Sequence, residues 1–166
     1  MKDYRYLYKA KASQDFPGEV KKGKWVEGSY VNFLPYQPGA WCTPETLAED
    51  EKNTKHYIAK GEFADWGMAR KMLLIEIDPL TLCQCTGIRV PFEPVKLNRH
   101  GEPFTTFLWE YDTVEVGGEK GVVRWDENIC AFVIKDLKDE TKTISIVSDI
   151  ADIVHTGNVF NNVEEI

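Results

Sequence analysis

The cysteines of this chain come nearest to a metal-binding pattern. Cys83 and Cys85 are two residues apart, so on a β-strand their thiols lie on the same face. Together with Cys130 and a histidine they would supply the four ligands of a structural zinc site. Such sites normally combine two closely spaced pairs and this chain has one, so we favour small, buried, reduced thiols. The sequence accordingly predicts no metal and no cofactor.

Other catalytic patterns are missing from the sequence. The three histidines stand at positions 56, 100 and 155 in unrelated contexts, and no serine lies in a G-x-S-x-G motif. The chain has neither a Walker A loop nor a G-x-G-x-x-G phosphate-binding loop. Carboxylates are abundant, and nothing singles out two of them as an acid and base pair. We therefore expect a protein that is not an enzyme, with a small hydrolase or metal enzyme as the remaining alternative.

The second half of the chain has the pattern of an antiparallel β structure. From Leu108 onward, short runs rich in Val, Ile, Phe and Trp alternate with gaps that contain Gly, Asp or Asn. This pattern predicts a mainly β protein with a small β-barrel over about residues 105–160. Trp109, Trp125 and Phe132 lie in these runs and are expected to help fill the barrel.

The first half is expected to add an elaborated β portion. The opening strand alternates tyrosines with other residues around Tyr6, and a second strand over about 25–33 completes a hairpin with a long basic tip. A Thr-Pro-Glu sequence, typical of a helix start, predicts a short helix at about 44–52, and one or two short helices are expected in all. Further strands are predicted at 56–59, 72–77 and 80–88, before an extended connector at 90–104.

The net charge of -7 lies entirely in the second half. Residues 1–82 contain 12 basic and 12 acidic residues, whereas residues 83–166 contain 8 and 15. We therefore divide the chain into an N-terminal β portion, 1–82, and a barrel portion, 83–166, which together make either two parts or one compact unit. An acidic barrel argues against nucleic-acid binding there. The chain has no apolar run of membrane-spanning length and no signal-peptide core, so we expect a soluble cytoplasmic protein.

Three blocks of the sequence occur in the order and spacing of a family signature. They are DPLTLCQCTGI from Asp78, LWEYDTVEV from Leu108 and IVHTGNVFNNVEEI from Ile153. In this order they resemble the YopX family of bacteriophage and prophage proteins. The chain departs from the family at Tyr111, where the second block normally has Gly, and in a longer segment that ends in Asn98-Arg99-His100-Gly101. The resemblance implies a mainly β fold with an SH3-like barrel, and it brings no known activity, cofactor or catalytic residue.

The same blocks have a structural interpretation. Thr86-Gly87 and Gly157-Asn158 suit sharp backbone bends, because Gly and Asn tolerate positive φ. Asp112 is placed to accept hydrogen bonds from a turn backbone. We expect these residues to make the fold and not a reactive site.

Aromatic residues in the irregular segments carry the functional hypothesis. Tyr36 and Trp41 lie in the Pro- and Gly-rich segment 34–42, and Trp66 lies in the segment 61–67. Such residues often anchor protein–protein contacts; the alternative is that both segments fold back and cap the barrel. The sequence therefore predicts an interaction module that binds another protein or a second copy of itself. The YopX resemblance implies that it is phage-encoded, that it acts in the cytoplasm of a bacterial host, and that its partner is a host or a phage protein.

Nucleic-acid association is the second functional hypothesis. It would use the neutral first half of the chain, where a cluster of lysines makes a local basic patch. These lysines are Lys9, Lys11, Lys21, Lys22 and Lys24.

Overall fold

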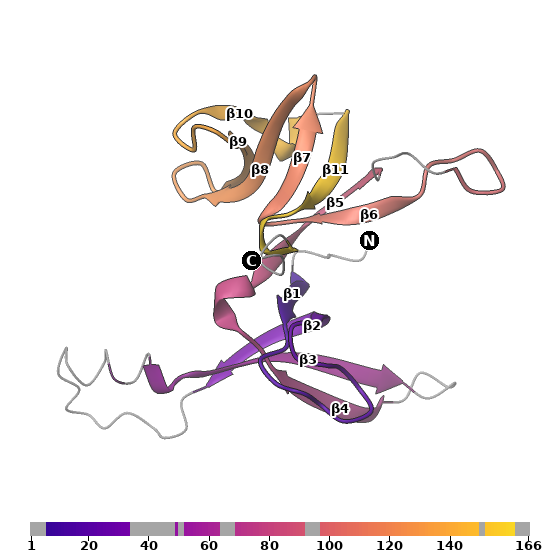
Figure 1. Ribbon diagram of the computed structural model, residues 1–166, viewed down its shortest axis with the longest axis vertical. Helices are drawn as coiled ribbons and strands as arrows, with labels where there is room; N and C mark the ends of the chain where they lie inside the picture. Colours follow the sequence, from indigo (N-terminus) through magenta and orange to yellow (C-terminus); the bar gives the residue numbers. More distant parts are fainter. Residues whose placement is uncertain are drawn as a thin grey trace. The chain divides into compact units, whose positions relative to one another are not determined.

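The computed structural model describes residues 6–33, 49, 52–63, 69–91, 97–149 and 152–161. Within these residues the protein is mainly β, as the sequence predicts (Figure 1). It divides into two compact units, an N-terminal unit over Tyr6–Leu82 and a C-terminal unit that begins at Cys83.

The N-terminal unit is an antiparallel sheet with the strand order β4-β3-β2-β1. At one end the sheet curls, so that the chain after β1 meets the chain after β4. There Ala12 bridges Ile77, and the Ser13 N–H donates to the Glu76 carbonyl at 3.0 Å. The elements are β1 Tyr8–Lys11, β2 Trp25–Phe33, β3 Lys55–Phe63, β4 Ala69–Glu76 and the 3-10 turn η2 Pro79–Thr81.

The inner face of this sheet forms the core of the N-terminal unit. Alternate residues of each strand point inward, and the long β1–β2 loop adds Phe16 and Val20 to the same cluster. From the sequence, the tip of this hairpin is recognised only as long and basic. Its packing shows that the tip also contributes to the core. The buried members are Ala10, Ala12, Val26, Ile58, Ile75 and Ile77.

The C-terminal unit contains a β5–β6 hairpin and a five-stranded antiparallel sheet with the order β10-β9-β8-β7-β11. Consecutive strands pair from β7 to β10, and the chain then returns through the 3-10 turn η3 Val147–Asp149, so that β11 pairs with β7. The pairings among the described residues do not close into a ring. The strands are β5 Cys83–Pro91, β6 Thr105–Trp109, β7 Asp112–Val116, β8 Glu119–Asp126, β9 Ala131–Asp136, β10 Thr143–Ile146 and β11 Ile153–Asn158.

A second apolar cluster fills the C-terminal unit. Most of its members come from strands that the sequence pattern predicts. Val90 comes from the end of β5, where the connector was expected, and Val147 comes from η3. Trp109 is buried as expected, but Trp125, which pairs with Phe132 near the end of β8, is partly exposed. The buried members are Val90, Leu108, Val114, Val123, Ile134, Val147 and Ile153.

Several predicted strands have different bounds in the structure, and the opening strand, expected around Tyr6, begins only at Tyr8. The run from Leu108 to Val116 is divided between β6 and β7 by a tight turn at Glu110 and Tyr111. The strand expected from residue 80 begins only at Cys83, because the Asp78 side chain accepts the Leu80 N–H at 3.0 Å and starts η2. Side-chain caps of this kind compete locally with strand pairing.

The remaining expectations concern the connector and the helix. The connector at 90–104 is part of an arm: β5 extends to Pro91, and the described residues 97–104 form a turn that leads back into β6. The helix expected at 44–52 lies almost wholly outside the described residues, of which Glu49, Lys52 and Asn53 are helical.

Candidate functional site

Asp112 is the most deeply buried charged residue of the C-terminal unit and is fully enclosed at the start of β7. The Trp109 backbone N–H donates to its Oδ2 at 2.9 Å, and the Asn158 side-chain amide donates to its Oδ1 at 2.8 Å. His155 Nε2 on β11 lies 3.4 Å from Oδ2. Asn158 in turn accepts the Phe160 N–H at 2.9 Å. The carboxylate thus ties the β6–β7 turn to the last strand.

An Asp–His pair can orient an imidazole for acid–base chemistry. Here, however, the carboxylate already accepts bonds from the turn backbone and from Asn158, which fix the β6–β7 turn and β11. The expected turn-capping role of Asp112 is confirmed, and we interpret its cluster as structural.

The turn beside Asp112 has a backbone conformation that L-residues seldom adopt. Tyr111 has a φ of 64°. Its ring lies 4.2 Å from the guanidinium carbon of Arg124 and 5.1 Å from the Phe160 ring. A non-glycine residue in this region costs about 1 kcal/mol or more, which these contacts offset. The same φ is a physical reason for the glycine that the YopX block has at this position.

Glu110 precedes Tyr111 in this turn, and its pKa is raised above the ordinary value of a glutamate. Burial raises the pKa of Glu110, against the opposing effect of the Trp125 N–H, which donates to its Oε1 at 3.4 Å, and of nearby Arg124. A half-buried carboxyl with a raised pKa is a feature of many active sites, but structural positions also produce it.

Glu110→Gln should make stability less dependent on pH. Because the pKa of Glu110 is raised in the folded state, the unfolded chain releases this proton at a lower pH than the folded chain does. The stability of the wild type therefore falls as the pH rises from the unfolded-state pKa to the folded-state pKa of Glu110. Glutamine cannot ionise and still offers an acceptor to Trp125, so the variant should gain stability relative to wild type between about pH 4 and pH 7. Urea unfolding of both proteins at the two pH values measures this gain. If the difference in stability between Glu110→Gln and wild type were the same at both pH values, the prediction would be wrong.

The three sequence blocks converge on this region of the C-terminal unit. From the first block, Thr86 Oγ1 donates to the Leu108 carbonyl at 2.9 Å, and Gly87 has a φ of 81°, as expected. Gly157 does not have a positive φ; a side chain there would instead approach Thr113 Oγ1 at 3.2 Å. The residues through which the blocks contact one another therefore stabilise the fold.

The three cysteines that were considered as zinc ligands lie in different surroundings in this unit. Cys83 and Cys85 are buried on β5, whereas Cys130 is exposed in the β8–β9 turn, so the expectation of a buried thiol is wrong for Cys130. In the part of the chain that the structure describes, no group of three or more His, Cys, Asp or Glu side chains has a metal-binding arrangement.

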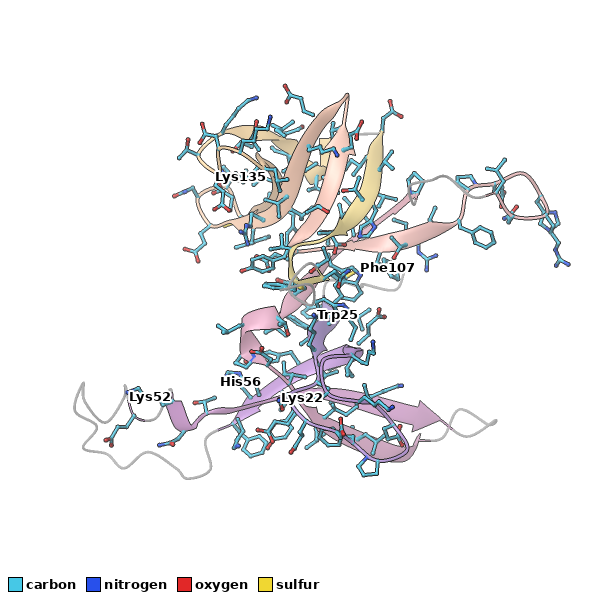
Figure 2. The ribbon with its side chains drawn as sticks, viewed as in Figure 1. Lys22, Trp25, Lys52, His56, Phe107 and Lys135 are labelled. Carbon is cyan, nitrogen blue, oxygen red and sulfur yellow. The ribbon has the colours of Figure 1, made fainter. Side chains whose placement is uncertain are left out.

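In the N-terminal unit, His56 belongs to an aromatic stack (Figure 2). The Tyr30 hydroxyl lies 2.6 Å from His56 Nδ1, and the two rings stack with centroids 6.0 Å apart. Burial raises the pKa of Tyr30, and the tautomer of the imidazole determines which of the two groups donates. Tyr8 continues the stack at 5.6 Å, so the group extends the core.

The outer face of the N-terminal sheet is apolar and exposed. Val31 pairs with Tyr57 across β2 and β3, and the rings of Phe33 and Tyr57 stack 5.2 Å apart at 5°. On β4, Leu74 is 43% exposed and Met72 is 73% exposed. We call these five residues the outer face. Contiguous apolar surfaces of this kind mark interaction sites.

Charged side chains border the outer face at both ends. At one end, Lys55, the first residue of β3, forms an ion pair of 3.0 Å with Glu76, the last residue of β4. Near the start of β2, the Lys9 and Lys11 ammonium groups lie 5.1 and 5.8 Å from the centroid of Trp25, which Figure 2 labels. The face is therefore an apolar surface with a polar rim, the usual anatomy of a protein contact.

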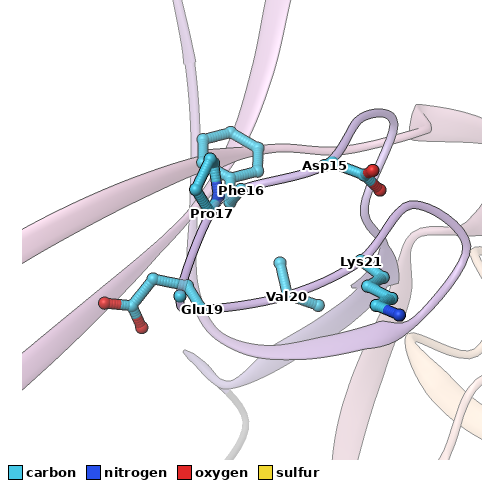
Figure 3. Close-up of a pocket in the computed structure, with 7 residues that line it drawn as sticks. Asp15, Phe16, Pro17, Glu19, Val20 and Lys21 are labelled. Carbon is cyan, nitrogen blue, oxygen red and sulfur yellow. The ribbon is translucent and has the colours of Figure 1, made fainter.

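A hollow of about 410 Å³ lies within the β1–β2 loop (Figure 3). The residues that line it include Phe16, which packs on the core, and the acidic residues Asp15 and Glu19. Asp15 Oδ1 accepts the Lys22 N–H at 2.8 Å. We interpret the hollow as the interior of the loop's own turn.

Tyr36, Trp41 and Trp66, the predicted contact residues, lie outside the described residues. The sequence reasoning did not single out the outer face. One signal was present: residues 72–75 of β4 read Met-Leu-Leu-Ile, which is apolar on both faces of the strand, whereas a half-exposed strand normally alternates.

No protein-family model, curated protein or solved structure matches this chain. Within the part of the chain that the structure describes, no helix combines the length and apolar composition that a membrane crossing requires.

Proposed function

We propose that this chain is a non-enzymatic interaction module that binds a partner protein through the outer face of its N-terminal unit. The observation that carries the proposal is the exposed apolar surface of Val31, Phe33, Tyr57, Met72 and Leu74. The face is a sheet surface on which the stacked rings of Phe33 and Tyr57 are nearly parallel. It suits a protein surface better than a small molecule, whose sites are concave.

The aromatic anchors predicted from the sequence belong to the same proposal. Tyr36 and Trp41 follow β2 in the sequence, and Trp66 follows β3; residues 61–63 of the segment that was expected to be irregular belong to β3. We propose that these three aromatic residues border the contact, where truncation of a hot-spot aromatic costs roughly 2 kcal/mol or more of binding.

The finer classification is part of the proposal as well. We assign an SH3-like topology to β7–β11, in which a four-stranded meander is followed by a 3-10 turn and a last strand beside the first. Support for a phage protein of the YopX family, acting in the cytoplasm of a bacterial host, comes from the three blocks and from the positive φ at Tyr111.

Met72→Lys combined with Leu74→Lys should abolish partner binding. Both side chains are exposed, so the charges should break an apolar contact and leave the sheet folded. Affinity capture from infected host cells, with quantitative mass spectrometry, compares the double variant with wild type. Circular dichroism and melting temperature should be nearly unchanged.

Leu80→Lys is the matched control. Leu80 is also highly exposed in the N-terminal unit, but it lies on η2, away from the outer face. Its variant should capture the partner as wild type does. Equal capture by the double variant and wild type would refute the outer face as the contact.

A specific observation favours nucleic-acid association as the second candidate. All five lysines of the predicted patch belong to β1 and the β1–β2 loop, and two of them lie over Trp25. Retention on DNA that falls with salt, and that is lost in Lys21/Lys22/Lys24→Ala, would favour this candidate over a protein partner.

A further inference from the structure

The β5–β6 arm of the C-terminal unit ends in a well-fixed turn. Asn98 Oδ1 accepts the backbone N–H groups of His100 and Glu102 at 2.8 and 3.1 Å. The Asn98 backbone N–H donates to the Glu102 carbonyl at 2.8 Å, and the Gly101 N–H donates to the Asn98 carbonyl at 3.0 Å. The tip is thus held in one conformation before any partner binds, which lowers the entropic cost of a contact.

The fixed tip presents apolar side chains to solvent. Leu97 is 60% exposed and Phe104 is 54% exposed, on either side of the turn. Arg99 is exposed between them at the end of the arm. A rigid aromatic side chain beside an arginine is the usual composition of an interaction hot spot.

A second exposed apolar surface lies at the β8–β9 end of the same unit. Trp125 and Phe132 form an edge-to-face pair at 5.1 Å, and Trp125 is 42% exposed. Ile129, in the intervening turn, is 52% exposed. Glu127 is exposed in the same turn, whose shape is fixed by the Asp126 side chain accepting the Asn128 N–H at 3.0 Å.

The two surfaces differ in charge. The tip, residues 97–104, carries the exposed Arg99 and Glu102, whereas residues 125–134 around the β8–β9 turn carry Asp126 and the exposed Glu127 and no lysine or arginine. An apolar tip with an exposed arginine therefore complements an apolar surface that carries the exposed Glu127 carboxylate.

One chain cannot join its own tip to its own β8–β9 end. Figure 1 shows the arm on the right of the C-terminal unit and the β8–β9 turn on the left. A contact between the two surfaces must therefore form between copies. Because the surfaces are different, it is heterologous and continues from copy to copy until it closes in a ring.

We propose that the arm tip of one copy docks on the β8–β9 end of a second copy, and that the protein self-associates head to tail. Phe104 and Leu97 pack against Trp125 and Ile129 of the next copy, and Arg99 faces its acidic surface. The contact involves few residues on each copy, so association is weak and should increase as the protein concentration is raised.

Two single substitutions and their mixture test this arrangement. Phe104→Asp alters the tip and Ile129→Asp alters the β8–β9 end, and each residue is exposed. In sedimentation velocity, wild type should form dimers and larger species as concentration rises, and each variant alone should stay monomeric. An equimolar mixture should form dimers and nothing larger, since only one intact pair of surfaces remains.

Leu137→Asp is the control, because Leu137 is exposed just beyond the opposite end of β9 and should not alter association. Arg99→Glu replaces Phe104→Asp if circular dichroism shows that the latter is unfolded. Monomeric wild type at the highest concentration, unchanged association of both variants, or a mixture without dimers would each overturn the proposal. None of these outcomes bears on partner capture by the outer face.

Discussion

Asp112→Ala is expected to destabilise the C-terminal unit by about 3–5 kcal/mol, since it removes one member of a buried charged network. The Trp109 N–H and the Asn158 amide would both lose a buried acceptor, and His155 would lose the carboxylate beside it. The β6–β7 turn and β11 would then no longer be tied together. Urea unfolding followed by circular dichroism measures the loss.

Two further substitutions serve as comparisons for Asp112→Ala. Asp112→Asn keeps one acceptor oxygen in place, so its loss should be smaller than that of alanine. Asp152→Ala removes a carboxylate that is exposed just before β11, and it should stay within about 0.5 kcal/mol of wild type. If Asp112→Ala were as stable as wild type, the cluster would have no structural role and its Asp–His pair would need another explanation.

Gly28→Ala should destabilise the N-terminal unit by about 3 kcal/mol or more. A Cβ at this position would lie 2.4 Å from the Ala59 carbonyl oxygen and 2.8 Å from Cγ2 of Ile58. The first of these atoms is backbone of the neighbouring strand, so relief requires β2 and β3 to separate. Ile58 is a fully buried core residue, so the disturbance extends into the cluster beneath.

Gly18→Ala distinguishes crowding from backbone strain in the same unit. Gly18 has a φ of 80°, but a Cβ there would meet nothing within 4 Å. Alanine should therefore cost only about 1 kcal/mol, through the unfavourable φ alone. Thermal melting of the two variants gives the comparison, and a Gly28→Ala protein no less stable than Gly18→Ala would contradict the steric argument.

The sequence by itself determined the β character and several turn positions. Alternation of apolar residues predicts strands because successive side chains point to opposite faces, and β2, β8 and β9 follow from it. Asp112 as a turn acceptor and Gly87 at positive φ also depend on nearby residues, so local pattern was enough to predict them.

Tertiary structure decided which faces are covered and which distant residues meet. Periodicity groups Met72 with Leu74 but does not say whether anything packs over them, and it places Trp125 in an apolar run without showing that its side chain is partly exposed. The Asp112–Asn158 hydrogen bond joins residues 46 positions apart, through the return of β11 to β7. Such pairings arise from the balance of burial over the whole chain, which no local window of sequence contains.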